Sequence, residues 1–327
     1  MPLPQLSLVK PRTLAEALLA LAENPGARPF AGGTDLLVSM KHGLFGPSHL
    51  VDLKAVAGLD RFEVTDGGAV LGAAVRLSRL RDHPAIRELY PALAQAAGAV
   101  ANPPVQNMGT LGGNICLDTR CWYYNQSPFW RKSRGYCLKK GGEVCRVAPA
   151  SKRCFAVFAA DTVPALIALG ARASLARRDG SGVAEREVPL EDLYLDDGAH
   201  RMALAPGEIV TCVRLPSGRS VRSGYAKYRK RASIDYPLAG VAAAVRRDGS
   251  RMTDVKIALT GLASAPVLAR EAMAAFEGAE PAPELFAAAA ELAAKAARPV
   301  QNQAGTPAHR RHMARVLCRR LLEGLTG

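Results

Sequence analysis

The chain has 327 residues, of which 49% are apolar and 22% charged. This composition is that of a globular protein with about two domains and excludes a disordered chain. The net charge of +14 leaves a nucleic-acid partner open, but the cations are spread along the chain as on an ordinary solvated surface. No apolar run approaches about 18 residues and no signal peptide is recognisable, so we expect a cytoplasmic protein without a membrane segment.

The predicted elements of the first two thirds alternate between helix and strand. Thr13 and Glu16 form a capping box, and leucines at helical spacing follow until Pro25. Periodicity and turn residues then predict, in chain order, strands over 28–31 and 49–56, a hairpin over 62–65 and 69–75, a helix over 77–99 interrupted near Pro84 and Pro91, a helix over 164–169, and strands over 171–177 and 208–215.

A linker is predicted at 216–220, and a smaller unit follows it. This unit has strands over 224–230, 238–246 and 255–261 and then helices. The last helix is expected to begin with Thr306 as its cap and Pro307 at its first position, and to end before Gly324. The sequence therefore predicts a chain of mixed helix and sheet content, with a larger unit followed by a smaller one.

Four of the seven cysteines lie within residues 121–154, separated by 15, 7 and 8 residues: Cys121, Cys137, Cys145 and Cys154. Four thiolates suit a [4Fe–4S] cluster, with one sulfur for each iron, and they also suit a structural zinc ion. Zinc sites usually contain closely spaced cysteine pairs, which this window lacks. The spacing therefore favours iron–sulfur over zinc, and leaves unligated or disulfide-bonded cysteines open. Cys212 and Cys318 have apolar neighbours and are interpreted as small buried hydrophobic residues.

Two turns contain paired glycines followed by a polar residue, in the segments PFAGGTDL (29–36) and NMGTLGGN (107–114). Glycines allow backbone N–H groups to approach a phosphate and to form an anion-binding nest. Neither segment is a Walker loop or a G-x-G-x-x-G fingerprint, so a Rossmann fold is not expected. Two such turns together predict a pyrophosphate held from two sides.

These segments, with Lys41, the stretch DTVPAL (161–166), the stretch GEIV (207–210) and the stretch GLASAP (261–266), resemble the FAD-binding subunit of the molybdenum hydroxylases. This family contains xanthine dehydrogenase and carbon monoxide dehydrogenase. The resemblance implies an α+β fold, with a two-part, non-Rossmann FAD-binding domain of the PCMH type over 1–218 and a smaller α+β carboxy-terminal domain over 222–327. The cysteines lie in an insertion over 115–155, which resembles the one that carries a [4Fe–4S] cluster in the β subunit of 4-hydroxybenzoyl-CoA reductase.

The resemblance assigns cofactor residues by position. The first pyrophosphate loop would be formed by Pro29, Phe30, Ala31, Gly32, Gly33, Thr34, Asp35 and Leu36, and the second by Thr110, Leu111, Gly112, Gly113 and Asn114. Asp35 is alternatively a turn-stabilising residue. Asp161 resembles an aspartate that binds polar groups of the flavin, Lys227 a lysine near its isoalloxazine ring, and Val100 an apolar neighbour of the ring. The cluster ligands would begin at Cys121, which leaves out Cys116. No catalytic residue is predicted on this chain.

The resemblance also implies the cofactors and partners. The chain would carry FAD and one [4Fe–4S] cluster, and would assemble with a molybdopterin-binding large subunit and a [2Fe–2S] small subunit, in a dimer of heterotrimers. Ferredoxin would deliver electrons to the cluster, and they would reach molybdenum through FAD to remove an aromatic hydroxyl group from a thioester substrate. The same subunit would also serve a xanthine or carbon monoxide dehydrogenase-like hydroxylase, with electrons moving the other way. Neither nucleic acid nor membrane is implied.

Two other classes stay open at the level of sequence. A basic zinc-loop protein would bind nucleic acid in a salt-sensitive manner and carry no flavin. A flavoprotein oxidase that acts alone would be stable and active without partner subunits. The two glycine turns and the cysteine window together favour the electron-transfer subunit over both.

Overall fold

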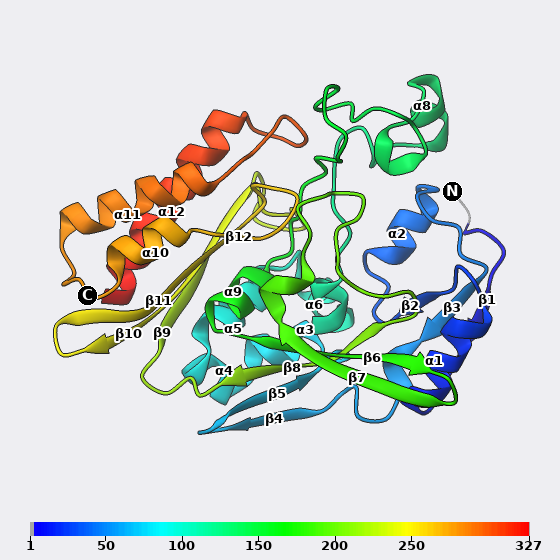
Figure 1. Ribbon diagram of the computed structural model, residues 1–327, viewed down its shortest axis with the longest axis horizontal. Coiled ribbons are helices and arrows are strands. Elements are labelled where there is room, and N and C mark those ends of the chain that lie inside the picture. The colour runs from blue at the N-terminus through cyan, green and yellow to red at the C-terminus, as the bar shows by residue number, and fades with distance from the viewer. Residues whose placement is uncertain (1–2, 327) are drawn as a thin grey trace.

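The computed structural model describes residues 3–326, and its strands form three sheets in that range (Figure 1). The first sheet is parallel, in the order β1-β3-β2, with strands Ser7–Val9, His49–Asp52 and Arg28–Phe30. The second is antiparallel, in the order β4-β5-β8-β6-β7, with strands Phe62–Thr65, Gly68–Gly72, Ile209–Pro216, Arg172–Asp179 and Gly182–Pro189. The third is antiparallel, in the order β12-β11-β10-β9, with strands Val267–Leu268, Arg251–Thr260, Ala239–Asp248 and Arg222–Tyr228.

Helices lie both in the larger unit and in the carboxy-terminal unit. Those of the first two thirds are α1 Leu14–Glu23, α2 Leu36–Lys41, α3 Leu77–Asp82, α4 Pro84–Leu89, α5 Pro91–Ala99, α6 Pro103–Met108, α7 Leu111–Ile115, α8 Pro128–Ser133 and α9 Thr162–Ala168. The carboxy-terminal ones are α10 Arg270–Phe276, α11 Pro283–Ala296 and α12 Pro307–Thr326. None of the helices described in residues 3–326 combines the length and apolarity needed to cross a bilayer.

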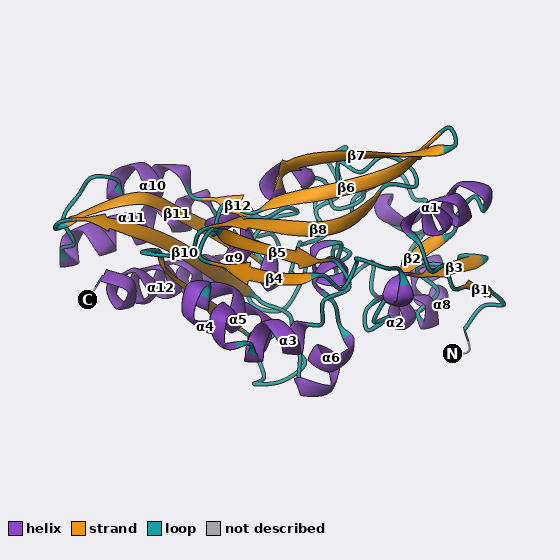
Figure 2. Cartoon of the chain, turned by 90° about the horizontal axis from the view of Figure 1, so that it is seen from below, coloured by secondary structure: helices purple, strands orange, loops and turns teal. Residues whose placement is uncertain are grey.

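The helices α3 to α5 show how proline placement shapes the larger unit. Pro84 and Pro91 each occupy the first turn of a new helix, where a missing N–H group costs nothing. The predicted helical stretch is therefore broken into three pieces, which pack beside the five-stranded sheet (Figure 2). Leu71 of β5, Leu80 of α3 and Leu93 of α5 are fully buried in the same core.

The carboxy-terminal unit is a sheet covered by three helices. Alternate residues of β10 face them, and Val241 and Ala243 lie in one core with Phe276 and Phe286. Small alanine side chains on α11, including Ala289 and Ala293, are fully buried there and allow close approach of the helix to its neighbours.

Two local expectations from the sequence are wrong. The last helix does not end before Gly324 but continues to Thr326. The strand expected over 49–56 ends at Asp52, whose side chain accepts from the N–H of Lys54 and starts a short 3₁₀ turn. The segment predicted as a linker contacts the carboxy-terminal sheet, because the carbonyl groups of Ser217 and Arg219 accept hydrogen bonds from the side chain of Arg246 in β10.

The insertion over 115–155 extends from the body beside α2, with α8 at its outer end (Figure 1). Arg131 of α8 is buried, and its guanidinium donates to the carbonyl groups of His42 at 3.2 Å and Gly43 at 2.9 Å, just beyond α2. It also donates to the carbonyl of Gln126 within the insertion. Lys140 adds a bond to the carbonyl of Leu44. The insertion is therefore fastened to the helix that follows the first glycine turn.

We predict that Arg131→Met lowers the free energy of unfolding by about 2–4 kcal/mol, because three carbonyl groups lose the donor that this buried side chain supplies. Urea unfolding measures this loss, and limited proteolysis should show faster cleavage within 115–155. Arg134→Met is the matched control, because Arg134 is exposed and lies only near the ring of Trp130. Equal stability of the two variants would contradict the anchoring role.

Candidate functional site

The first glycine turn leaves a row of unused backbone donors. It connects β2 to α2, and Gly33 adopts a φ of 70°, which a side chain would strain. Its carbonyl accepts from the N–H of Leu37 at 3.0 Å. Within the described chain, the N–H groups from Gly32 to Leu36 have no protein acceptor. Consecutive free N–H groups of this kind form an anion-binding concavity.

The two glycine turns lie against each other. A Cβ on Gly32 would come within 1.9 Å of the carbonyl oxygen of Met108, which precedes the second turn. A Cβ on Gly109 would lie 3.6 Å from the hydroxyl of Thr34 in the first turn. The absence of a side chain at Gly32 is therefore what allows the turns to meet, as expected for two turns that share one ligand.

The backbone N–H groups of the second turn are not free to bind phosphate as expected. Thr110 caps the short helix α7 by accepting from the N–H of Gly113 at 3.2 Å. The N–H groups of Leu111 and Gly112 donate to the carbonyls of Val75 and Ala73, each at 2.8 Å. That part of the interpretation is corrected, because these N–H groups already have protein partners. The paired glycines here permit close packing instead, since a Cβ on Gly112 would lie 2.7 Å from that of Ala73.

Asn114, at the end of the second turn, connects it to α9. Its Oδ1 accepts from the backbone N–H of Thr162 at 3.1 Å and from the Thr162 hydroxyl at 2.7 Å. Both residues are buried. The predicted site residue Asn114 is thus a positioning residue between α7 and α9 in this structure, and its side-chain N–H₂ group is the part left for a ligand.

Asp35 is engaged by two side chains from distant parts of the sequence. Its Oδ1 accepts from the guanidinium of Arg120 and, at 3.2 Å, from the hydroxyl of Tyr236. Its side chain makes no capping bond to α2, so it is not the turn-stabilising residue considered from the sequence. Its carboxylate joins the first glycine turn to the start of the insertion and to the carboxy-terminal unit.

Asp161 and Lys227 form a buried ion pair between α9 and β9. The Lys227 ammonium group lies 3.0 Å from Oδ2 of Asp161 and donates to the carbonyl of Ala99 at 2.9 Å, while Tyr225 donates to Oδ1 at 2.7 Å. Burial raises the pKa of Asp161 and lowers that of Lys227, and their mutual attraction opposes both shifts. The predicted residue Val100 directly follows Ala99, whose carbonyl accepts from Lys227, and it packs against the core of the larger unit.

The four clustered cysteines surround one hollow, with about 250 Å³ of space, part of it open to solvent. Each is at most 8% exposed, although they come from separate parts of the insertion. Tyr123, Tyr124 and Lys139 also line the hollow. However, no group of three or more His, Cys, Asp or Glu side chains in residues 3–326 is arranged to hold a metal ion. The structure brings the predicted ligands together but does not by itself support a metal centre.

The thiols of this hollow differ in their acidity. A hydrogen bond from Cys154 lowers the pKa of Cys145 to about 5, and the same bond raises that of Cys154. Burial raises the pKa of Cys121 to about 11.

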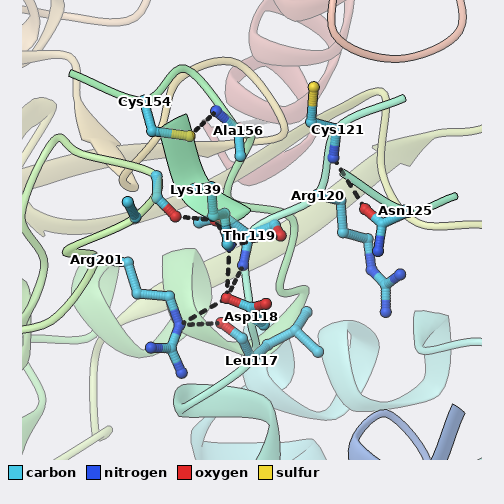
Figure 3. Close-up of polar contacts among 12 residues, drawn as sticks. Leu117, Asp118, Thr119, Arg120, Cys121, Asn125, Lys139, Cys154, Ala156 and Arg201 are labelled. Carbon is cyan, nitrogen blue, oxygen red and sulfur yellow. Dashed lines mark hydrogen bonds and ion pairs between the residues drawn. The ribbon is translucent and has the colours of Figure 1, made fainter. Parts of the chain in front are cut away.

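A largely half-buried polar cluster lies near Cys121 and Cys154 (Figure 3). Lys139 lies 2.7 Å from Oδ1 of Asp118 and donates to the carbonyl of Thr119 at 3.1 Å. The guanidinium of Arg201 approaches the same Oδ1 to 3.5 Å. Asp118 and Thr119 lie between α7 and Cys121, and Lys139 and Arg201 hold this segment in one conformation.

Sequence reasoning missed Asp118, Arg120, Lys139 and Tyr236. Their partners lie 20 or more residues away, so no local spacing marks them. The one available signal was position, because Asp118 and Arg120 lie in the short segment that joins the second glycine turn to the first clustered cysteine.

Comparison with known proteins places this geometry in a family. The model of the "FAD binding domain in molybdopterin dehydrogenase" matches residues 4–218, and that of the "CO dehydrogenase flavoprotein C-terminal domain" matches residues 224–325. The chain belongs to the family of FAD-binding subunits of molybdenum hydroxylases. The predicted fold class is confirmed, with a PCMH-type FAD-binding domain followed by a smaller α+β domain.

Individual members of this family are similar to this chain over most of their length. The chain is 36% identical over 263 residues to the aldehyde oxidoreductase FAD-binding subunit PaoB of Escherichia coli, a match that covers 78% of this chain and 80% of the relative. It is 28% identical to the carbon monoxide dehydrogenase medium chain of Afipia carboxidovorans, covering 96% of this chain and 94% of the relative. A solved structure of carbon monoxide dehydrogenase from Hydrogenophaga pseudoflava superimposes with a TM-score of 0.80, at 25% identity, covering 99% of this chain and 98% of that chain.

Membership of this family refines the expectations from the sequence. It supports FAD as a cofactor and an oxidoreductase subunit as the class of protein. These relatives are named as subunits of dehydrogenases and an aldehyde oxidoreductase, and they give no support for particular closeness to 4-hydroxybenzoyl-CoA reductase. The xanthine or carbon monoxide dehydrogenase-like alternative therefore fits better than the reductase.

Proposed function

We propose that this chain is the FAD-carrying electron-transfer subunit of a molybdenum-containing dehydrogenase. The observation that carries the proposal is the contact between the two glycine turns at Gly32, beside the free N–H groups of Gly32 to Leu36. A row of free donors in a concave turn suits the diphosphate of a dinucleotide. The matched FAD-binding family model supports the same ligand.

The residues of this chain bind and orient the cofactor. The first glycine turn would hold the diphosphate, and Thr34, Thr110 and Asn114 would add polar side chains. Lys227 has used two of its three ammonium donors, on Asp161 and Ala99, which leaves one for the flavin. FAD, when bound, accepts and releases electrons singly or in pairs. No residue of this chain is proposed to touch the substrate.

Substrate chemistry would take place on partner subunits. The chain would assemble with a molybdopterin-binding large subunit and a [2Fe–2S] small subunit, in a dimer of heterotrimers. In this arrangement electrons leave the molybdenum centre and reach this subunit last. The name of the PaoB relative makes aldehydes the first substrate class to test.

The four clustered cysteines would hold a [4Fe–4S] cluster. Four sulfurs around one hollow suit a cluster, which takes one thiolate for each of its irons, better than a single ion, which needs all its ligands at one point. Tyr123, Tyr124 and Leu138 would shield such a group from water, and Lys139 would offset its negative charge. A cluster of this kind passes one electron at a time between this subunit and a partner.

The reductase is the second candidate, and the cysteine insertion is the observation that favours it. In that case ferredoxin would deliver electrons to the cluster, and the molybdenum centre would use them to remove an aromatic hydroxyl group. Both candidates share the same cofactors on this chain. They differ in the direction of electron flow, which ligand identity does not determine.

Anaerobic purification with the partner subunits tests the proposal. We expect one FAD for each copy of this chain, with iron and acid-labile sulfide beyond the content of the small subunit. Anaerobic addition of an aldehyde should bleach the flavin absorbance if the complex is a dehydrogenase. Bleaching by reduced ferredoxin alone, with turnover of an aromatic thioester, would favour the reductase. A complex without flavin would contradict the proposal as a whole.

We predict that Lys227→Met weakens FAD binding and also lowers the free energy of unfolding by about 3–5 kcal/mol, since it leaves the buried Asp161 carboxylate unpaired. The double variant Lys227→Met, Asp161→Asn should recover most of the stability, because no uncompensated charge is left. Urea unfolding and flavin titration separate the two effects. Full recovery of FAD affinity in the double variant would contradict a flavin contact by Lys227.

A further inference from the structure

Three parts of the chain meet at the guanidinium group of Arg120. This residue lies between α7 and Cys121, among the first residues of the insertion. Its Nη2 donates to Oδ1 of Asp35 in the first glycine turn and to the hydroxyl of Tyr236. Its Cζ lies over the Tyr236 ring, 3.8 Å from the ring centre. The group is thus held in position by a carboxylate, a hydroxyl and an aromatic ring.

Two of the three nitrogens of this guanidinium have no hydrogen-bond partner in residues 3–326. Among the described residues, Nη1 makes no hydrogen bond, and Nε is buried without an acceptor. An arginine presents five N–H donors in a planar fork, and a buried donor that is left unpaired is unfavourable. Both donor edges of this guanidinium include Nη2, which is already engaged, so Nη1 is the donor left for one charge-assisted hydrogen bond to a phosphate.

We propose that Arg120 binds the diphosphate of FAD, and that Asp35 and Tyr236 hold its guanidinium in place without touching the cofactor. This inference rests on the proposed function, because it takes FAD to be the ligand of the first glycine turn. It assigns a flavin-binding role to the insertion, in addition to the role of its cysteines.

The electrostatics of the first turn explain why a cation is needed at this point. Asp35 lies within the row of free N–H groups from Gly32 to Leu36, and its carboxylate would repel a diphosphate. Arg120 neutralises that carboxylate through one nitrogen and retains other donors. The nest can then accept an anion although it contains an aspartate.

The backbone of Arg120 is held independently of the cysteines. Its N–H donates to the carbonyl of Val157 at 2.8 Å, and its carbonyl accepts from the N–H of Val157 at 2.7 Å. Figure 3 shows the side chains of Arg120 and Cys121 leaving the chain in opposite directions. One short segment therefore presents a cation to the flavin turn and a thiol to the cysteine hollow.

Flavin titration of the full chain, freed of its flavin, tests this inference. FAD and riboflavin are compared, since riboflavin lacks the diphosphate. We expect Arg120→Met to weaken FAD binding by roughly 10- to 100-fold, the loss typical of a charged hydrogen bond, and to leave riboflavin binding unchanged. Arg120→Lys should lose less, because it keeps the charge without the fork. Arg186→Met is the control, since Arg186 forms a comparable pair with Glu208 in the five-stranded sheet.

Equal loss of FAD and riboflavin affinity in Arg120→Met would overturn the inference, since it would make Arg120 only a connection between parts of the fold. Unchanged FAD affinity would overturn it as well. If Arg120→Met does not fold, Arg120→Lys decides, with FAD and riboflavin compared in the same way. We expect a loss confined to FAD, so an equal loss for riboflavin, or no loss at all, would overturn the inference. A wild-type chain without FAD would instead contradict the proposed function.

Discussion

Gly32→Ala is expected to abolish flavin binding, with flavin content falling from about one per chain to less than a tenth of that. The new Cβ would lie 1.9 Å from the carbonyl oxygen of Met108 and 2.6 Å from its carbonyl carbon. Both atoms belong to the backbone, so no side-chain rotation can make room. The two glycine turns would have to separate, and the donors of the first turn would no longer face the second. Absorbance at the flavin band of the purified chain measures the effect.

A graded series of alanine variants makes this result interpretable. In Gly33→Ala the new Cβ would lie 2.6 Å from the ring of Phe30, and the residue would have to adopt a φ of 70°. The variant is therefore strained, but the Phe30 side chain can move and relieve part of the clash. Gly46→Ala is the control, because nothing lies within 4 Å of its Cβ and its φ is not positive. We expect flavin content to rise from Gly32→Ala through Gly33→Ala to Gly46→Ala. Full flavin in a folded Gly32→Ala variant would show that contact between the turns is not needed for binding.

Elements whose cause is local could be predicted from the sequence. The capping residue Thr13 accepts from the N–H of Glu16 as expected, and the prolines at 84 and 91 break the long helical stretch where predicted. The hairpin around Asp66 pairs β4 with β5. In each case the deciding interaction lies within a few residues, so the pattern of side chains contains the necessary information.

The parts of the site that depend on distant residues could not be predicted in this way. The sequence suggested that both glycine turns donate N–H groups to phosphate, but the donors of the second turn are taken by carbonyls of Ala73 and Val75. Asp35 was considered a ligand or a turn residue, yet its partners are Arg120 and Tyr236. These contacts form only because α7, the insertion and the carboxy-terminal unit come together in the fold. The spacing of residues along the chain does not predict which distant segments will be in contact.

The second large effect is expected at the four clustered cysteines. Replacing any one of Cys121, Cys137, Cys145 or Cys154 with serine should remove about four irons and the matching sulfide from each chain. Serine is close in size to cysteine, so the loss would reflect the missing thiolate rather than a cavity. Cys212→Ser is the matched control, because Cys212 lies in β8, away from the hollow. Iron, sulfide and zinc analysis of anaerobically purified protein measures the outcome.

FAD should stay bound in the same four variants. Arg120, next to Cys121, is held to Val157 by two backbone hydrogen bonds, and Arg131 and Lys140 fasten the insertion to the residues that follow α2. None of these contacts involves a cysteine sulfur, so the flavin turn should keep its geometry when the cluster is lost. Electron transfer from an acidic protein donor should then fail, while a small artificial donor still reduces the flavin. One zinc per chain without sulfide in the wild type would contradict the cluster and would make the insertion a structural element.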